Sequence, residues 1–311
     1  MRPTVLQLGP MLPLVEQGLA ANYTHLLLGK APDAARFLAE HGAAVDAVVS
    51  SGRAGVNAAL LEAVPNARIV AHFGVGYDNV DVECARGKGV VVSNTPDVLT
   101  DCVADLAMGL VIDVARGVSA GDRYVRAGRW LKGPMPLATK VSGKRLGVVG
   151  LGRIGRAIAA RAEGFDMEIR YHNRRQSPDA PYPFEHSLLE LARWCDFLMV
   201  ATSGGEATRG LISAAVIDAL GPEGFLVNIA RGSVVDEPAL VAALAAKRVA
   251  GAALDVFADE PRVPEALLAM DNVVLTPHIA SATTDTRAAM GQLVLDNLAS
   301  FFETGRALTP V

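Results

Sequence analysis

The chain has 311 residues, of which 51% are hydrophobic and 20% charged, and its formal net charge is −4 at pH 7. This length allows two domains with separate cores, and the negative charge argues against a nucleic-acid-binding surface. No run approaches the roughly 20 apolar residues that cross a membrane. The 3 cysteines show no CxxC spacing, which is typical of reduced thiols in a cytoplasmic protein. The 6 histidines show no metal-binding spacing, so we predict no metal site.

The first 96 residues alternate short branched apolar runs with Ala-rich helical segments. Such alternation predicts a parallel sheet covered by helices. The predicted strands are Val5–Gly9, Leu26–Leu28, Ala47–Val49, Ile69–Ala71 and Val90–Val92.

Two loops in this region are candidate walls of a substrate site, because ligands of open α/β sheets lie beyond the carboxyl ends of strands. One contains Ser51 and Gly52 after the third strand, and the other contains Gly74-Val75-Gly76 after the fourth. A Gly-Val-Gly loop exposes backbone N–H groups that can hold a carboxylate. The same glycines suit an ordinary turn, so the residues alone leave both interpretations open.

A long helix is predicted to run to about Arg116, with Asp97 or Thr100 as its N-cap. The crossover between domains is predicted at its start. The segment that follows, residues 117–144, contains several Gly and Pro residues and is predicted to be irregular. Its Trp130 is either an anchor for a partner or a side chain that packs locally.

A glycine motif organises the second half of the chain. The apolar run Leu146–Val149 predicts a buried strand, and Gly150-Leu151-Gly152-Arg153-Ile154-Gly155 follows it. A helix ending near Gly164 and a strand at Met167–His172 are predicted next. Strand, glycine turn, helix and strand are typical of a dinucleotide-binding fingerprint, in which a pyrophosphate lies on the helix N-terminus.

The end of that second strand indicates which dinucleotide binds. NAD enzymes usually carry an acidic residue about 20 positions beyond the fingerprint, for the ribose 2′-hydroxyl. This chain has Asn173, Arg174 and Arg175 there and no carboxylate. Guanidinium groups suit a 2′-phosphate, so NADPH is predicted in preference to NADH. A solvated basic turn is the alternative.

Further strands and helices complete a second parallel-sheet domain, and the last helix is predicted to return to the first domain. The substrate domain is therefore predicted to be discontinuous, with residues 1–96 and 284–311. The dinucleotide-binding domain spans residues 97–283. The predicted elements are strands at Asp196–Ala201, Gly224–Ile229, Ala250–Leu254 and Val273–Leu275, and helices at Ser187–Arg193, Ala214–Leu220, Glu237–Lys247 and Asp285–Glu303.

Three residues suited to ketone reduction follow three of these strands. Arg231, Glu260 and His278 are predicted to meet at the carboxyl edge of one parallel sheet. A cation can bind and polarise an α-keto acid, and an imidazole beside a carboxylate can deliver a proton near neutral pH. Each residue alone has an ordinary structural interpretation, but together they favour a catalytic one.

Five motifs together resemble the D-isomer-specific 2-hydroxyacid dehydrogenase family over nearly the whole chain: NTPDVLTD, GLGRIG, VNIARGSVVDE, DVFADEP and TPHIAS. The glyoxylate/hydroxypyruvate reductases and hydroxyphenylpyruvate reductases look most similar, since they share the RR end of the second strand. The resemblance implies two Rossmann-like, doubly wound parallel-sheet α/β domains with a cleft between them, and a homodimer formed through the cofactor domain. Residues 201–205 depart from the family pattern, because many relatives carry a proline-containing loop there.

Roles are also implied by position. Arg231 would bind the substrate carboxylate and orient the keto oxygen, His278 would donate the proton, and Glu260 would be its partner. Trp130 is the candidate for an aromatic side chain that reaches the neighbouring subunit's substrate. The implied substrate contacts are Ser51, Gly52, Val75, Gly76, Trp130 and Arg231, and the implied cofactor contacts are Gly150, Leu151, Gly152, Arg153, Ile154, Asn173, Arg174, Arg175, Ile229, Ala230 and Asp255.

The sequence therefore predicts a cytoplasmic, NADPH-dependent reductase of small 2-keto acids such as glyoxylate and hydroxypyruvate, with D-2-hydroxy acids as products. The alternative is a dinucleotide-sensing regulator, similar to transcriptional corepressors of this fold. An unrelated reductase with a Tyr-x-x-x-Lys pair is excluded, because no tyrosine has a lysine four positions later.

Overall fold

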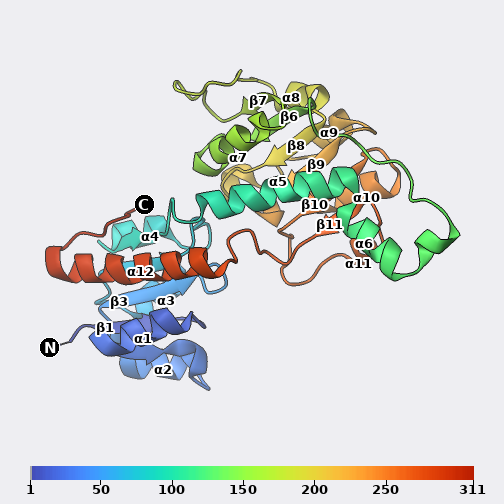
Figure 1. The fold of residues 1–311 in the computed structure, drawn as a ribbon. Coiled ribbons are helices and arrows are strands. Elements are labelled where there is room, and N and C mark those ends of the chain that lie inside the picture. Colours follow the sequence, from blue (N-terminus) through green and yellow to red (C-terminus); the bar gives the residue numbers. More distant parts are fainter. Residues whose placement is uncertain (1) are drawn as a thin grey trace. The chain divides into compact units, whose positions relative to one another are not determined.

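The computed structural model describes residues 2–311 and divides them into two compact units, both drawn in Figure 1. The first unit contains the chain up to Leu99 together with Thr283–Val311, and the second contains Thr100–Ala282. The predicted boundaries, after residue 96 and before residue 284, lie close to these limits. No helix within residues 2–311 has the length and apolar character needed to cross a membrane.

The first unit is built on a five-stranded parallel sheet of order β2-β1-β3-β4-β5. Its central strands are buried along nearly their whole length, as expected for a parallel sheet covered on both faces. All five predicted strands are confirmed. They are β1 (Thr4–Gln7), β2 (Thr24–Leu27), β3 (Ala47–Ser51), β4 (Ile69–Phe73) and β5 (Val91–Ser93).

The last helix belongs to this unit, as predicted. Helix α12 (Thr284–Thr304) packs against β4 and α1 (Pro13–Asn22). Its first turn is capped by Thr283, whose side chain accepts a hydrogen bond from the N–H of Thr286, and it ends at Gly305 with φ of 77°. The unit's other helices are α2 (Ala34–His41), α3 (Ala58–Ala63) and α4 (Val82–Gly87).

The second unit contains a six-stranded parallel sheet of order β11-β10-β9-β8-β6-β7. The chain reverses its direction of winding between β6 and β8, and ligands of such sheets bind at this switch point. The strands are β6 (Arg145–Val149), β7 (Glu168–His172), β8 (Phe197–Val200), β9 (Phe225–Asn228), β10 (Gly251–Leu254) and β11 (Val273–Leu275). The helices are α5 (Thr100–Arg116), α6 (Val118–Arg126), α7 (Arg153–Glu163), α8 (Leu188–Trp194), α9 (Ala214–Leu220), α10 (Glu237–Ala245) and α11 (Glu265–Leu268).

The prediction that residues 117–144 are irregular is wrong for their first part, which forms α6 and a short 3-10 turn, Arg129–Lys132. Gly117, with φ of 62°, ends α5 in the left-handed conformation. The carboxylate of Asp113 then accepts hydrogen bonds from the N–H and hydroxyl of Ser119. A side chain from the preceding helix therefore starts the new one, which a search for local capping residues does not detect.

Candidate active site

The residues Arg231, Glu260 and His278 follow β9, β10 and β11, which are neighbours in one parallel sheet. Parallel strands end at the same edge, so the three loops start side by side. The predicted placement of this trio at adjacent strand ends agrees with the structure.

His278 and Glu260 form a direct pair. The imidazole Nδ1 lies 2.7 Å from the Glu260 Oε2, and the other carboxylate oxygen accepts a hydrogen bond of 3.1 Å from the N–H of Phe257. The side chains are 43% and 35% exposed, respectively, so both can reach a ligand. A carboxylate accepts, so Nδ1 carries the proton of this bond, and Nε2 makes no hydrogen bond within residues 2–311. The pair therefore offers Nε2 to a ligand.

The surroundings of Glu260 keep its carboxyl group ionised. Burial by itself raises its pKa, but the hydrogen bond and charge of His278 lower it, with help from the Phe257 N–H and the charge of Arg231. The overall shift of the Glu260 pKa is downward. The Glu260 carboxylate thus stays negative at neutral pH and accepts the hydrogen bond from the Nδ1–H of His278.

Asp255 holds the loop that carries His278. Its fully buried carboxylate accepts hydrogen bonds from the hydroxyl of Thr276 (2.6 Å) and from the N–H groups of Ile279 (2.8 Å) and Ala280 (2.9 Å). His278 has φ of 54°, a left-handed conformation that is rare for a residue other than glycine. These three bonds flank that residue and fix its conformation. Asp255 was predicted only as a cofactor contact, and this positioning role was missed.

Arg231 lies on a loop packed tightly against the loop of Glu260. A Cβ on Gly232 would collide with the backbone of Phe257, so glycine is required at this approach. The carbonyl of Arg231 accepts a hydrogen bond of 3.0 Å from Asn228, at the end of β9. The guanidinium donates to the carbonyl of Ala230 at 2.8 Å.

The glycine motif has the geometry expected for dinucleotide binding. Gly150 has φ of 100°, and a Cβ there would lie 2.6 Å from the backbone of Thr202. A Cβ on Gly155 would collide with the carbonyl of Gly150, so helix and strand pack closely there. A Cβ on Gly152 would meet nothing within 4 Å.

That open space at Gly152 lies at the N-terminus of α7, an 11-residue helix with no side-chain cap. The first N–H groups of a helix have no partner within it and attract anions. The residues present therefore fit the pyrophosphate of a dinucleotide.

The segment after β7 has two different functions. The Asn173 Oδ1 accepts a hydrogen bond of 2.7 Å from the N–H of Leu151, so this amide braces the glycine turn, and the Leu151 N–H is already engaged. Arg174 and Arg175 are exposed and make no ion pair within residues 2–311. These two guanidinium groups can therefore approach an anion.

The remaining predicted contacts are placed as follows. The N–H of Ile229 donates to the carbonyl of Val200, and the N–H of Ala230 donates to the Asn228 side chain. Both N–H groups are therefore already bonded at the end of the sheet. In the first unit, Asn79 donates to the carbonyls of Ser51 and Gly52 and holds their loop. Val75 and Gly76 follow β4 and are half-buried. No group of three or more His, Cys, Asp or Glu side chains within residues 2–311 is arranged to hold a metal ion.

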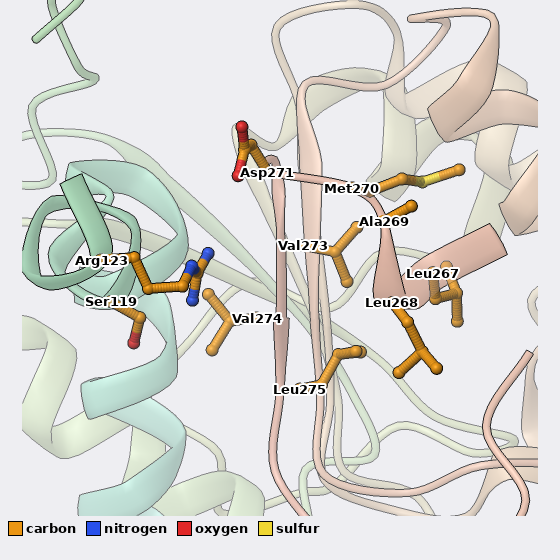
Figure 2. Close-up of a pocket in the computed structure, with 10 residues that line it drawn as sticks. All are labelled: Ser119, Arg123, Leu267, Leu268, Ala269, Met270, Asp271, Val273, Val274 and Leu275. Carbon is orange, nitrogen blue, oxygen red and sulfur yellow. The ribbon is translucent and has the colours of Figure 1, made fainter. Parts of the chain in front are cut away.

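One pocket of about 230 Å³ lies elsewhere in the second unit, between α6 and the edge strand β11 (Figure 2). Figure 2 shows the Arg123 side chain of α6 opposite Val274 of β11. The other residues that line this pocket are mostly apolar, and Arg231, Glu260 and His278 are not among them. The lining comprises Ser119, Arg123, Leu267, Leu268, Ala269, Met270, Asp271, Val273, Val274 and Leu275.

Comparisons with known proteins agree with this geometry. Residues 108–280 match the family model described as "D-isomer specific 2-hydroxyacid dehydrogenase, NAD binding domain". The hydroxyphenylpyruvate reductase of Plectranthus scutellarioides is 48% identical over 307 residues, which cover 99% of this chain and 98% of that protein. The 2-ketogluconate reductase of Gluconobacter oxydans is 40% identical over 310 residues, which cover 100% and 99% of the two chains.

A solved structure shares the whole fold. It is an NADPH-dependent glyoxylate/hydroxypyruvate reductase from Sinorhizobium meliloti, in complex with NADP and malonate. Its TM-score is 0.95 at 44% sequence identity, and the match covers 100% of this chain and 97% of that one.

Proposed function

The chain belongs to the D-isomer-specific 2-hydroxyacid dehydrogenase family, and we propose that it uses NADPH to reduce the small 2-keto acids glyoxylate and hydroxypyruvate to 2-hydroxy acids, with the D configuration where the product is chiral. The observation that supports this most directly is the His278–Glu260 pair, with Arg231 on the adjacent loop. The relatives named above are reductases of different 2-oxo acids, which share a carboxylate beside a carbonyl group.

In this mechanism the cofactor supplies the hydride when it is bound. Arg231 binds the substrate carboxylate and draws electron density from the keto oxygen. His278 donates the proton on Nε2 to the developing alkoxide. Glu260 accepts the Nδ1–H, which orients the ring and stabilises its positive charge before the transfer.

The function is tested by steady-state assays of the purified protein with a panel of 2-keto acids, each with NADPH and with NADH. We expect the highest kcat/KM with glyoxylate or hydroxypyruvate and NADPH. The panel also contains hydroxyphenylpyruvate and 2-ketogluconate, because reductases of these acids are close relatives. A kcat/KM that is highest with one of those acids would replace the proposed substrate but keep the reaction.

The cofactor preference is proposed to depend on Arg174 and Arg175. A charge-assisted hydrogen bond contributes about 1.5–3 kcal/mol, which corresponds to about a 10- to 150-fold difference in affinity. Arg174→Asp combined with Arg175→Ala should therefore raise the Kd of NADPH by about that factor and leave the Kd of NADH nearly unchanged. Fluorescence titration of both cofactors measures this.

A matched control changes charge by the same amount elsewhere. Arg86→Asp combined with Lys88→Ala alters two exposed residues at the end of α4. It should leave the affinity for both cofactors at the wild-type value. Equal losses of NADPH and NADH affinity in the Arg174/Arg175 variant would refute the assignment.

We also propose a homodimer formed through the second unit. Figure 1 shows α6 and the segment after it, in green, at the far end of α5. Six large apolar side chains are exposed on these elements. A second copy would cover them. They are Val118, Val125, Trp130, Leu131, Met135 and Leu137.

Sedimentation velocity tests this assembly. The wild type should sediment as a dimer, and Leu131→Glu combined with Leu137→Glu should sediment as a monomer, because the charges would be buried in the interface. Leu14→Glu, on an exposed position of α1, is the control and should stay dimeric. A monomeric wild type would contradict the proposal. The contact of Trp130 with a partner's substrate depends on this dimer and stays a prediction.

A further inference from the structure

The loop after β4 has its peptide groups fixed from the protein interior. The carbonyl of Gly74 accepts a hydrogen bond of 2.9 Å from the N–H of Thr95, and the carbonyl of Val75 accepts one of 2.9 Å from the Asn94 Nδ2. The carbonyl of Gly76 accepts one of 3.0 Å from the His72 Nε2. Three successive peptide planes are therefore held by three buried residues.

This arrangement determines where the loop's N–H groups point. In a trans peptide the C=O and the following N–H point in opposite directions. Since the carbonyls of Gly74 and Val75 point to buried groups, the N–H groups of Val75 and Gly76 point away from them. Neither N–H has a hydrogen-bond partner within residues 2–311. Two consecutive unpaired N–H groups are a site for an anion such as a carboxylate.

The buried His72 ring lies against the loop and donates to it. The ring is 1% exposed, and a Cβ on Gly74 would lie only 3.1 Å from its Nε2. A carbonyl only accepts, so Nε2 carries the proton that is donated to Gly76. The Nδ1 lies 2.9 Å from the hydroxyl of the buried Ser50, on the neighbouring strand β3. Both ring nitrogens are thus engaged, and the ring cannot rotate without losing two hydrogen bonds.

Asn94 is itself held by two hydrogen bonds to Thr309. Its backbone carbonyl accepts a hydrogen bond of 2.6 Å from the hydroxyl of Thr309, and its N–H donates to the carbonyl of Thr309 at 3.2 Å. The same threonine is bonded to Asn297, a buried residue of α12. The donor to Val75 therefore belongs to a rigid network that extends to the last helix.

We propose that His72 and Asn94 are positioning residues that fix the N–H groups of Val75 and Gly76 for the carboxylate of the substrate. This inference rests on the proposed function, because that carboxylate is the ligand. Neither side chain needs to touch substrate. Their effect is on the geometry of the two donors, so it should appear in the binding of the carboxylate rather than in the proton transfer at His278.

The central experiment compares His72→Phe with His72→Gln in steady-state assays with hydroxypyruvate at saturating NADPH. Phenylalanine fills the space but donates nothing, and glutamine places an N–H near the position of Nε2. The KM of His72→Phe should rise by about 10- to 100-fold, as expected for the loss of a charged hydrogen bond. Its kcat should change much less, because the lost interaction is made in the ground state and the transition state alike. His72→Gln should recover a large part of the KM.

Variants of two other residues of the network test the same role, so the result does not depend on the folding of the His72 variants. Asn94→Leu keeps the shape and removes the donor to Val75, and Ser50→Ala removes only one hydroxyl. Both should raise the KM, with the smaller effect for Ser50→Ala. His25→Phe is the matched control, since His25 is a half-buried histidine of β2 in the same unit, and it should keep the wild-type KM. The Kd of NADPH should be unchanged in all of them.

Calorimetric titration with oxamate, a keto-acid analogue that is not reduced, separates this inference from the proposed function. If the wild type binds oxamate, His72→Phe binds it at least 10-fold more weakly, and no keto acid is reduced, the positioning role stands and the proposed function fails. If the wild type reduces keto acids while folded His72→Phe and Ser50→Ala keep its KM, the positioning role is overturned. Equal increases of KM in His72→Phe and His72→Gln, with loss of NADPH affinity, would also overturn it.

Discussion

Replacing His278 by alanine is expected to lower the kcat for hydroxypyruvate reduction by about 100- to 10,000-fold, the usual contribution of a general acid. The reason is that Nε2 is the available proton donor of the His278–Glu260 pair, and alanine leaves only water to protonate the alkoxide. The Kd of NADPH should stay near the wild-type value, because the glycine turn and α7 belong to another part of the sheet edge. Stopped-flow or steady-state kinetics with a parallel fluorescence titration measures both quantities.

The control for this variant is His41→Ala, which removes an exposed imidazole at the end of α2. It should keep the wild-type kcat. A His278→Ala protein that binds NADPH and turns over at the wild-type rate would eliminate the acid role. A parallel loss of NADPH affinity would indicate a wider structural defect at the strand ends.

Glu260→Gln is expected to change how the rate depends on pH. The pKa of Glu260 is shifted downward, so its carboxylate is ionised across the neutral range and is lost only as the pH falls through that lowered value. Glutamine removes both the charge and the group that becomes protonated. The fall of kcat/KM on the acid side that follows protonation of Glu260 should therefore be absent in the variant. At its best pH, kcat should be about 10- to 150-fold below wild type, for the loss of one charged hydrogen bond.

Full pH profiles of kcat and kcat/KM measure this prediction. Asp259→Asn is a suitable control, because Asp259 is the adjacent carboxylate and its pKa is lowered by an exposed pairing with Arg262 instead. Its profile should match that of the wild type. Coincident profiles for Glu260→Gln and wild type would count against the His278–Glu260 pair.

The fold follows from the sequence to a large extent because hydrophobic burial has a different period in strands and helices. Runs such as Ile69–Ala71 are apolar on both faces, and a short run of that kind fits a covered parallel sheet. The order of strands and helices then determined where Arg231, Glu260 and His278 lie, since each is in the loop that follows a strand. Residues 117–144 were predicted less well, because α6 begins with a cap from Asp113 in the preceding helix.

The supporting residues of the site could not be predicted for a related reason. Asp255, His72 and Asn94 act through hydrogen bonds to residues that are 19 or more positions away or across a loop. Their partners are backbone groups, which leave no pattern in the side chains. His72 lies in β4 and Asp255 directly follows β10, and a polar residue at such a position also fits the core.

The proposed function requires that Arg231, Glu260 and His278 form a catalytic site for keto-acid reduction. The most direct test is the absorbance of NADPH after hydroxypyruvate is added to the wild-type protein, with product analysis of the same sample. The account predicts steady loss of NADPH over many turnovers and an equal amount of D-glycerate. A protein that binds NADPH tightly but consumes none with any 2-keto acid would contradict the account and favour a dinucleotide-sensing role.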